Sequence, residues 1–291
     1  MGSPGWYRSH AMRAKQIYAD LVASSPYQPA TNYWRAVELD AVRQHGLPEG
    51  RGLDLGCGDG KLTQVLEQGL SSEAGRSWVG IDPDPEEASL AERVGLYEAV
   101  HVCGGDSIPE KDGSFDYVFS NSVLEHIPRI EPVVAEVARL VRSSGRFIFT
   151  VPASSFHECL GGPIMGRMSE EYLREVDRRC AHERYWSLVQ WKECLDRHGF
   201  DVVAHVEYLD SRQTRRWEVL SNMTGGLLYR LHGGRARPIE IQRSLRMRRA
   251  GTGIIDRLAA HLSHVALLGA DPSAQTGDAK HACLLVDAIR R

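Results

Sequence analysis

The chain has 291 residues, of which 42% are hydrophobic, 25% charged and 8% aromatic, and its formal net charge is −3. This composition is that of a folded protein with a full core, so it excludes disordered and fibrous classes. No apolar run approaches the roughly 20 residues of a bilayer span, and the N-terminus has no apolar signal segment, so we expect a cytoplasmic protein without a transmembrane segment. The six cysteines include no Cys-x-x-Cys pair, which predicts free thiols.

Residues 1–46 are predicted to form an N-terminal helical leader or lid. Apolar side chains such as Ile17 and Leu21 recur at helical spacing, and a turn-rich stretch at 24–29 interrupts the pattern. The leader is therefore expected to contain two helical parts.

Residues 47–210 have the alternating pattern of a parallel α/β sheet. Short apolar runs end in Gly or Asp, and helix-compatible segments follow them. Five strands are expected in RGLDLG, SWVGIDPD, AVHVCGGD, FDYVFSNS and GRFIFTVP, a sixth in DVVAHVEYLD and a seventh, at 281–291, in HACLLVDAI. Residues 153–186 have no clean period and are expected to be an insertion into this core.

The stretch 211–280 is too long to be a simple connection between the last two strands. We therefore predict a helical, Arg-rich insertion there. Residues 211–250 contain ten arginines against two glutamates, which gives a local charge of +8. This stretch is interpreted in three ways: as a solvated helix face, as a surface for an anionic acceptor or nucleic acid, or as a contact with an anionic membrane.

The most informative motif is the turn LDLGCGDG. Glycines at 56, 58 and 60 permit torsions that other residues avoid and let a ligand approach the backbone. The spacing differs from the Gly-x-Gly-x-x-Gly of dinucleotide sites, and Asp54 makes the turn acidic. An acidic turn disfavours a pyrophosphate and favours a ligand that carries an ammonium and a sulfonium. Asp59 is expected to cap the following helix.

Four motifs in order, LDLGCGDG, GIDPD, GGDSIPEKDGSFDYVFSNSVLEHI and GRFIFTVP, resemble the class I S-adenosylmethionine-dependent methyltransferases. The resemblance is to small-molecule enzymes like those of ubiquinone and menaquinone biosynthesis. It implies an α/β, doubly wound Rossmann-like sheet with N-terminal helices and helical cap insertions. Residues 47–210 would be the S-adenosylmethionine-binding core.

The resemblance also implies a cofactor site at the carboxyl ends of four strands. Asp54 and its turn would hold the methionine end, Asp82 would accept the ribose hydroxyls, and Asp106 with the Ser107 amide would read the adenine edge. Two residues after the fourth strand would line the sulfonium region. The expected set is Asp54, Gly56, Cys57, Gly58, Asp82, Pro83, Asp106, Ser107, Asn121 and Ser122.

Methyl transfer depends mainly on holding two reactants in register, and a hydroxyl acceptor must also lose a proton. The first candidate for the base is His126, just after the fourth strand, and the second is His182 in the insertion. The alternative for His126 is a surface histidine paired with Glu125. These two residues could also hold a divalent ion, but no metal site is predicted.

We therefore expect transfer of a methyl group to a hydroxyl, in preference to an amine, of a small molecule from natural-product or glycan metabolism. The acceptor is expected to be anionic or sugar-bearing. Two alternatives remain: an RNA methyltransferase, and a non-catalytic subunit that binds S-adenosylmethionine as a scaffold. Nucleic acid is not the expected partner, because the Arg-rich stretch has few interleaved aromatic residues.

Overall fold

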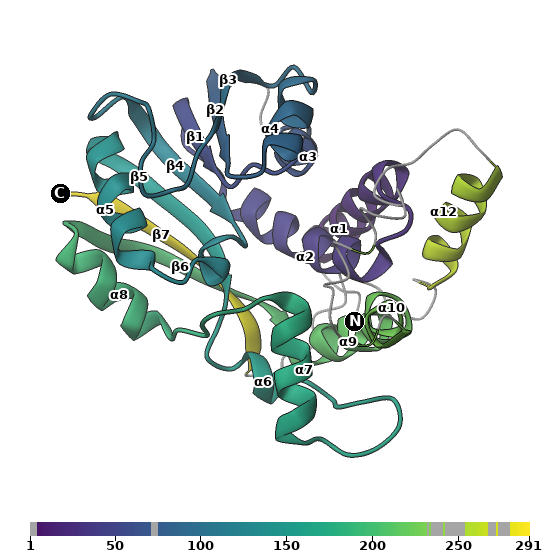
Figure 1. Cartoon of the computed structure of the whole chain (residues 1–291). Coiled ribbons are helices and arrows are strands. Elements are labelled where there is room, and N and C mark those ends of the chain that lie inside the picture. The colour runs from purple at the N-terminus through teal and green to yellow at the C-terminus, as the bar shows by residue number, and fades with distance from the viewer. Residues whose placement is uncertain are drawn as a thin grey trace. The chain divides into compact units, whose positions relative to one another are not determined.

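The computed structural model contains one seven-stranded sheet with accompanying helices (Figure 1). The chain divides into two compact units. It describes residues 5–70, 75–231, 233, 241, 254–266, 272 and 280–291. The unit that we call the sheet unit comprises Ala41–Ser154, Glu183–Glu207 and Cys283–Arg291. The other, the helical unit, comprises Met1–Asp40, Ser155–His182 and Tyr208–Ala282.

The sheet has the strand order β3-β2-β1-β4-β5-β7-β6. Its strands are β1 (Gly50–Leu55), β2 (Arg76–Asp82), β3 (Tyr97–Val102), β4 (Phe115–Asn121), β5 (Val141–Pro152), β6 (Phe200–Asp210) and β7 (His281–Arg290). The pairs from β3 to β5 are parallel, and β7 is antiparallel to β5. The chain builds outward from β1 to β3 and then returns to β4 on the other side of β1. Such a switch point opens a crevice at the carboxyl ends of β1 and β4, where ligands of doubly wound sheets bind.

Helices follow the strands as the sequence pattern predicts. The sheet unit contains α3 (Lys61–Glu67), α4 (Pro85–Glu92), the 3-10 helix η1 (Leu124–His126), α5 (Ile130–Leu140), α8 (Leu188–Arg197) and the end of α2 (Pro29–His45). Helix α4 begins at Pro85 after Asp84, whose carboxylate accepts the amide of Glu86 at 2.9 Å. All seven predicted strands are confirmed.

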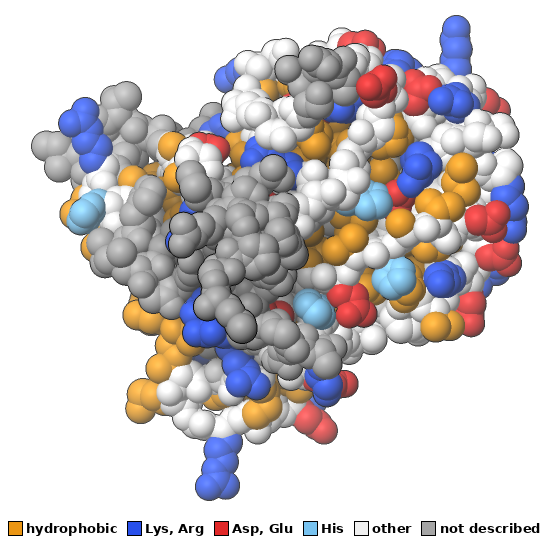
Figure 2. Space-filling model, turned by 180° about the vertical axis from the view of Figure 1, so that it is seen from behind, with side chains coloured by type: hydrophobic (Ala, Val, Ile, Leu, Met, Phe, Trp, Pro, Cys, Tyr) orange, Lys and Arg blue, Asp and Glu red, His pale blue; other side chains and the backbone are white. Residues whose placement is uncertain are grey.

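Acidic and basic side chains are interspersed over the right-hand part of the described surface in Figure 2. Neighbouring charges of opposite sign cancel within about one Debye length, so this area carries no extended field of a single sign. Of the ten arginines between 211 and 250, the six from position 235 onward lie outside the described residues.

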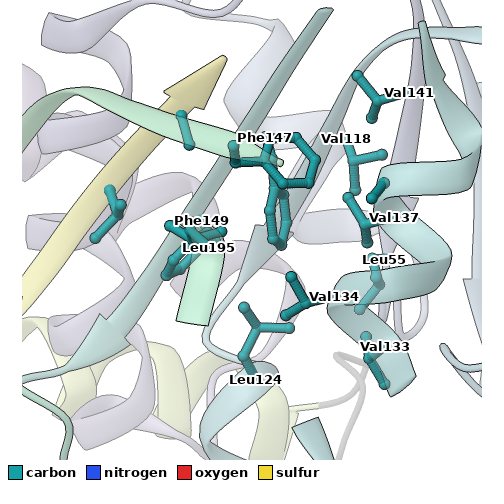
Figure 3. Packing of buried hydrophobic residues seen from close by; sticks show 14 of the residues in the cluster. Leu55, Val118, Leu124, Val133, Val134, Val137, Val141, Phe147, Phe149 and Leu195 are labelled. Carbon is teal, nitrogen blue, oxygen red and sulfur yellow. The ribbon is translucent and has the colours of Figure 1, made fainter. Parts of the chain in front are cut away.

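The core of the sheet unit lies between the sheet and helices α5 and α8. Val133, Val134 and Val137 of α5 point toward Leu55 and other strand residues in Figure 3. Trp191, Cys194 and Leu195 of α8 belong to the same buried cluster. Successive strand residues alternate between faces, so Leu53, Val79 and Val118 enter this core while their neighbours face α3 and α4. This burial fixes the register of the strands that end at the crevice.

The helical unit is built from the N-terminal helices and the two insertions. Its helices are α1 (Gly5–Ser24), most of α2, α6 (Phe156–Cys159), α7 (Glu170–Cys180), α9 (Ser211–Met223), α10 (Gly225–Leu231) and α12 (Ile254–Ala266). Glu218 of α9 is buried, and its carboxylate accepts the amides of Gly161 and Gly162 and the hydroxyl of Tyr172. No described helix combines the length and the hydropathy needed to cross a bilayer.

Two local features differ from the sequence interpretation. The stretch 153–186, in which no clean period was found, contains the regular helix α7, whose buried residues Tyr172, Val176 and Arg179 follow the helical spacing i, i+4, i+7 among mostly charged positions. Asp59 does not cap α3: the N-cap is Gly60, with φ of 75°, and Asp59 accepts only the amide of Lys61 at 3.3 Å. Glycine adopts this left-handed conformation without a steric penalty, which favours it at the N-cap.

Candidate cofactor and catalytic site

The turn between β1 and α3 is shaped by its glycines. Gly56, Gly58 and Gly60 have φ of 80°, 54° and 75°, in the left-handed region that side chains disfavour. The amides of Gly56 and Cys57 both donate to the carbonyl of Ile81 at 2.9 Å, which ties the turn to β2. A Cβ at position 58 would meet no atom within 4 Å, so the space beside that backbone is open. The turn can therefore receive a flat ligand.

Asp54 lies beneath this turn with 2% of its surface exposed. Its Oδ2 accepts the hydroxyls of Thr63 and Tyr97, each at 2.6 Å. Burial raises the pKa of Asp54 to about 6, the two hydroxyls oppose this rise, and the charge of Asp82 adds to it. The carboxyl is thus poised to ionise near neutral pH, and a cation would favour its charged form.

Thr63 and Tyr97 were not among the residues predicted for this site. Thr63 lies in the first turn of α3, where a hydroxyl facing back toward β1 was a signal that could have been used. Tyr97 opens β3, 43 residues from Asp54, and no local pattern connects the two.

Asp82, at the carboxyl end of β2, is held by the backbone. Its Oδ2 accepts the amide of Gly58 and its Oδ1 accepts the amide of Asp84, both at 2.9 Å. Amide donors favour the ionised carboxylate and fix its plane, and a carboxylate has about four acceptor positions in all. Pro83 follows it on the surface. Asp82 and the glycine turn are therefore one hydrogen-bonded assembly.

Asp106 and Ser107 lie in an exposed turn after β3. A Cβ at Gly104 would lie 2.8 Å from Oδ1 of Asp106, so the glycine lets this side chain fold back over its own loop. Both residues follow the strand next to Asp82, at the same edge of the sheet. Their position suits a contact with the outer part of a bound nucleoside.

Asn121 and Ser122 are buried where β4 ends. The amide of Ser122 donates to the carbonyl oxygen of Thr150 at 3.1 Å and to its Oγ1 at 3.0 Å, and the Thr150 hydroxyl donates to Oδ1 of Asn121 at 3.3 Å. Ser122 has φ of 49°, an uncommon value for a residue with a side chain. Strained backbone at a strand end is frequent where a binding site is formed.

His126 is carried by η1, directly after β4, and 39% of its side chain is exposed. Its Nε2 lies 3.9 Å from Oε1 of the buried Glu125, a distance at which the carboxylate stabilises a charged imidazole without a hydrogen bond. A Cβ at Gly56 would lie 2.5 Å from Cγ2 of Val123, the N-cap of η1. The turn between β1 and α3 and the segment with His126 therefore pack directly against each other.

Arg184 holds the loop around η1 in place through hydrogen bonds, and it was not among the residues predicted for the site. Its guanidinium donates to the backbone carbonyls of Leu124, Ile127 and Pro128, the last at 2.9 Å, and lies 5.3 Å from the ring centre of Trp186. Three carbonyl acceptors for one planar donor group fix the loop around η1 in one conformation. The contact spans about 60 residues, so spacing does not reveal it.

His182, the second candidate base, belongs to the helical unit. Its ring packs edge-on against Phe156 with centroids 5.6 Å apart, and it lies 6.5 Å from Trp34, which contacts Trp217. Within that unit it is therefore part of an aromatic cluster.

The residues of the sheet unit fit S-adenosylmethionine. The open space beside Gly58 admits a ligand at the backbone, and the carboxylate of Asp82 is oriented at a strand end. A cation next to the buried carboxyl of Asp54 would favour its ionised form. The fold and the turn together resemble those of the S-adenosylmethionine-dependent methyltransferases.

Comparison with known proteins agrees with this class. A family model described as a methyltransferase domain matches residues 30–205, more than half of the chain. The chain therefore belongs to the class I S-adenosylmethionine-dependent methyltransferase family.

Three curated relatives show similarity to this chain. An uncharacterized methyltransferase of Schizosaccharomyces pombe is 34% identical over 202 residues, which cover 66% of this chain and 74% of that protein. A ubiquinone biosynthesis O-methyltransferase of Methylococcus capsulatus is 28% identical over 153 residues, which cover 50% and 61%. An uncharacterized protein of Methanocaldococcus jannaschii is 29% identical, and the match spans only 56% of its length.

Solved structures confirm the fold. Geranyl diphosphate methyltransferase in complex with GPP and sinefungin aligns with a TM-score of 0.52 and 14% identity, over 89% of this chain and 77% of that one. The [4+2]-cyclase SpnF aligns with a TM-score of 0.51 and 14% identity, over 87% and 79%. Proteins with this fold thus carry names of different reactions, and the reaction must be argued from the site.

Proposed function

We propose that the protein transfers the methyl group of S-adenosylmethionine to a hydroxyl group of a small molecule. The supporting observation is the packing of Gly56 against Val123, because it brings the cofactor turn beside the segment that presents His126. S-adenosylmethionine supplies an electrophilic methyl group on a sulfonium. The chain supplies Asp54 for the cationic end, Asp82 for the ribose, Asp106 and Ser107 for the adenine, and a surface-accessible imidazole. Gly56, Cys57, Gly58, Pro83, Asn121 and Ser122 complete the proposed site.

His126 is the proposed base. An imidazole with an ordinary pKa near ~6.5 is suited to accept the proton of a hydroxyl at neutral pH, and the nearby carboxylate of Glu125 stabilises the imidazolium that results. This is the reason for preferring a hydroxyl acceptor to an amine. The name of the Methylococcus relative, an O-methyltransferase, supports the same choice.

The proposed acceptor is a small molecule of natural-product or glycan metabolism, anionic or sugar-bearing. The mixed charges on the right-hand part of the face in Figure 2 contrast with the continuous basic surface that RNA binding requires. An RNA substrate and a non-catalytic scaffold remain as outcomes of the test.

The test uses S-adenosylmethionine with a deuterated methyl group and a panel of phenols, glycosides, primary amines and bulk tRNA. We expect label on an oxygen of a phenol or glycoside. Label on nitrogen or in tRNA would contradict the proposal, as would calorimetric binding of S-adenosylmethionine without formation of S-adenosylhomocysteine with any acceptor.

Replacement of the base gives a second test. His126→Ala should lower kcat by about 100-fold or more and leave the Kd of S-adenosylmethionine unchanged. His205→Ala, at an exposed position of β6, is the matched control. A wild-type rate for His126→Ala together with a large loss for His182→Ala would move the base to the second candidate.

A further inference from the structure

Three side chains with different metal-binding atoms converge between helices α5 and α8. Glu131 lies in the first turn of α5, Cys194 is inside α8, and His198 is the C-cap of α8. Cys194 and His198 are four residues apart, so they project from the same side of the helix. One thiol sulfur, one imidazole nitrogen and one carboxylate oxygen lie within 4.8 Å of one another.

The chemistry of this donor set is selective. Zinc is bound in proteins by cysteine sulfur, histidine nitrogen and carboxylate oxygen, commonly in a tetrahedron, whereas calcium and magnesium take oxygen ligands almost exclusively. Three protein ligands leave one position for water. The three atoms therefore match zinc and exclude the hard cations.

Both oxygens of the Glu131 carboxylate already have partners, and an ion would enter by separating one of these contacts. Nε2 of His198 lies 2.5 Å from Oε2 of Glu131, and the guanidinium of Arg197 binds the other carboxylate oxygen, Oε1. Ligating carboxylates are normally hydrogen-bonded through their second oxygen, which fixes the direction of the first. Arg197 would serve in this way without leaving its place.

The three donors also suit the charge of a divalent ion. A thiolate and a carboxylate would balance the charge of Zn²⁺, the imidazole would bind as the neutral ring, and the thiol proton would leave to solvent on binding.

We propose that Glu131, Cys194 and His198 form a zinc site that joins the start of α5 to the end of α8. This site is independent of the acceptor chemistry proposed above, because Cys194 belongs to the core cluster between the sheet and α8. The ion would cross-link two helices that otherwise meet through side-chain packing and the hydrogen bonds of Glu131.

Zinc binding is measured on the full chain after treatment with a chelator and dialysis. Competition with a chromophoric chelator should give one Zn²⁺ per chain with a Kd below about 1 µM, and Co²⁺ should give a thiolate-to-cobalt charge-transfer band. Mg²⁺ in excess should not compete. Zn²⁺ should also raise the Tm of the wild-type protein.

The variants Cys194→Ser, His198→Ala and Glu131→Gln identify the ligands. We expect each to lower zinc affinity by about 100-fold, and Cys194→Ser to abolish the cobalt band. Cys180→Ser and His205→Ala, outside the three-residue group, should bind zinc as the wild type does. His198 is partly exposed, so its variant remains testable if the change at the buried Cys194 prevents folding.

Two results would overturn the site: no saturable zinc binding at micromolar concentration, or binding that is the same in all three ligand variants. Both measurements are independent of turnover. A failure of the zinc site is therefore distinguishable from a failure of the methyl-transfer proposal.

Discussion

The hydroxyl of Thr63 donates a 2.6 Å hydrogen bond to Oδ2 of Asp54, and the two residues form the floor of the glycine turn. Burial holds the pKa of Asp54 near 6, which is within the range of ordinary assays. If Asp54 faces the cationic end of S-adenosylmethionine, only its ionised form attracts the ligand. The affinity for the cofactor should therefore depend on this one carboxyl.

We predict that the Kd of S-adenosylmethionine falls by about 10-fold as pH rises from 5 to 7. Calorimetric titration across this range measures the effect. Asp54→Asn should bind the cofactor weakly at every pH, with the slope removed. An unchanged pH slope in Asp54→Asn would show that another group controls binding.

The raised pKa of Asp54 also fixes the direction in which this group changes the free energy of unfolding with pH. The pKa of Asp54 is about 6 in the folded protein and 3.8 without burial, so between these values the folded state binds more protons. The free energy of unfolding of the ligand-free protein should then decrease as pH rises through this window, by about 3 kcal/mol in total for this group. Urea denaturation of the wild type and Asp54→Asn at pH 4.5 and 6.5 isolates the contribution. A difference between the two proteins that does not change with pH would contradict it.

Alanine substitutions at Gly56 and Gly58 should distinguish an effect on protein stability from an effect on cofactor affinity. A Cβ at Gly56 collides with Val123, so Gly56→Ala should reduce the free energy of unfolding by about 2–4 kcal/mol, and a second change, Val123→Ala, should recover part of the loss. A Cβ at Gly58 meets open space, so Gly58→Ala should cost only about 1–2 kcal/mol.

In contrast, Gly58→Ala should lower the affinity for S-adenosylmethionine by about 10-fold or more, because its methyl group would occupy space proposed for the ligand. Thermal unfolding and calorimetric titration of the two variants provide the comparison. Wild-type cofactor affinity in Gly58→Ala would place the ligand elsewhere.

Arg184 is predicted to act on turnover through the position of His126. Arg184→Ala removes the donors to three loop carbonyls, so kcat should fall by about 10-fold while the Kd of the cofactor stays unchanged. Arg184→Lys retains one point charge and should restore part of the rate. Arg129→Ala, on the exposed part of the same loop, is the control. Equal losses in kcat and in cofactor affinity would indicate general unfolding of the loop instead.

Site residues marked by local sequence signals could be predicted, and residues that reach the site through contacts distant in sequence could not. The strand ends at Asp54, Asp82 and Asn121 could be predicted because apolar runs and glycines mark them locally. The partners Tyr97 and Arg184 could not, since their contacts join segments 43 and about 60 residues apart. Their side chains carry no periodic or spacing signal, and only the folded chain brings them to the carboxylate and the loop.

The place of Asp59 shows a different limit. Its residue type is a frequent helix cap, but the turn needs a left-handed residue at the capping position, and this backbone requirement outweighs side-chain preference. Helix α7 was missed for another reason: its buried residues Tyr172, Val176 and Arg179 have helical spacing, but one of the three is an arginine and most other positions of the helix are charged.

The position of β7 has a consequence for biosynthesis. Strand β6 has β7 as its sheet neighbour, yet residues 211–280 are translated between the two. While the nascent polypeptide leaves the ribosome, β5 has an unpaired edge and β6 has no place in the sheet until residues 281–290 emerge. The last step of sheet assembly is therefore the insertion of β7 between β5 and β6. A message truncated before β7 would yield a five-stranded sheet in which the unpaired edge of β5 can pair with another chain.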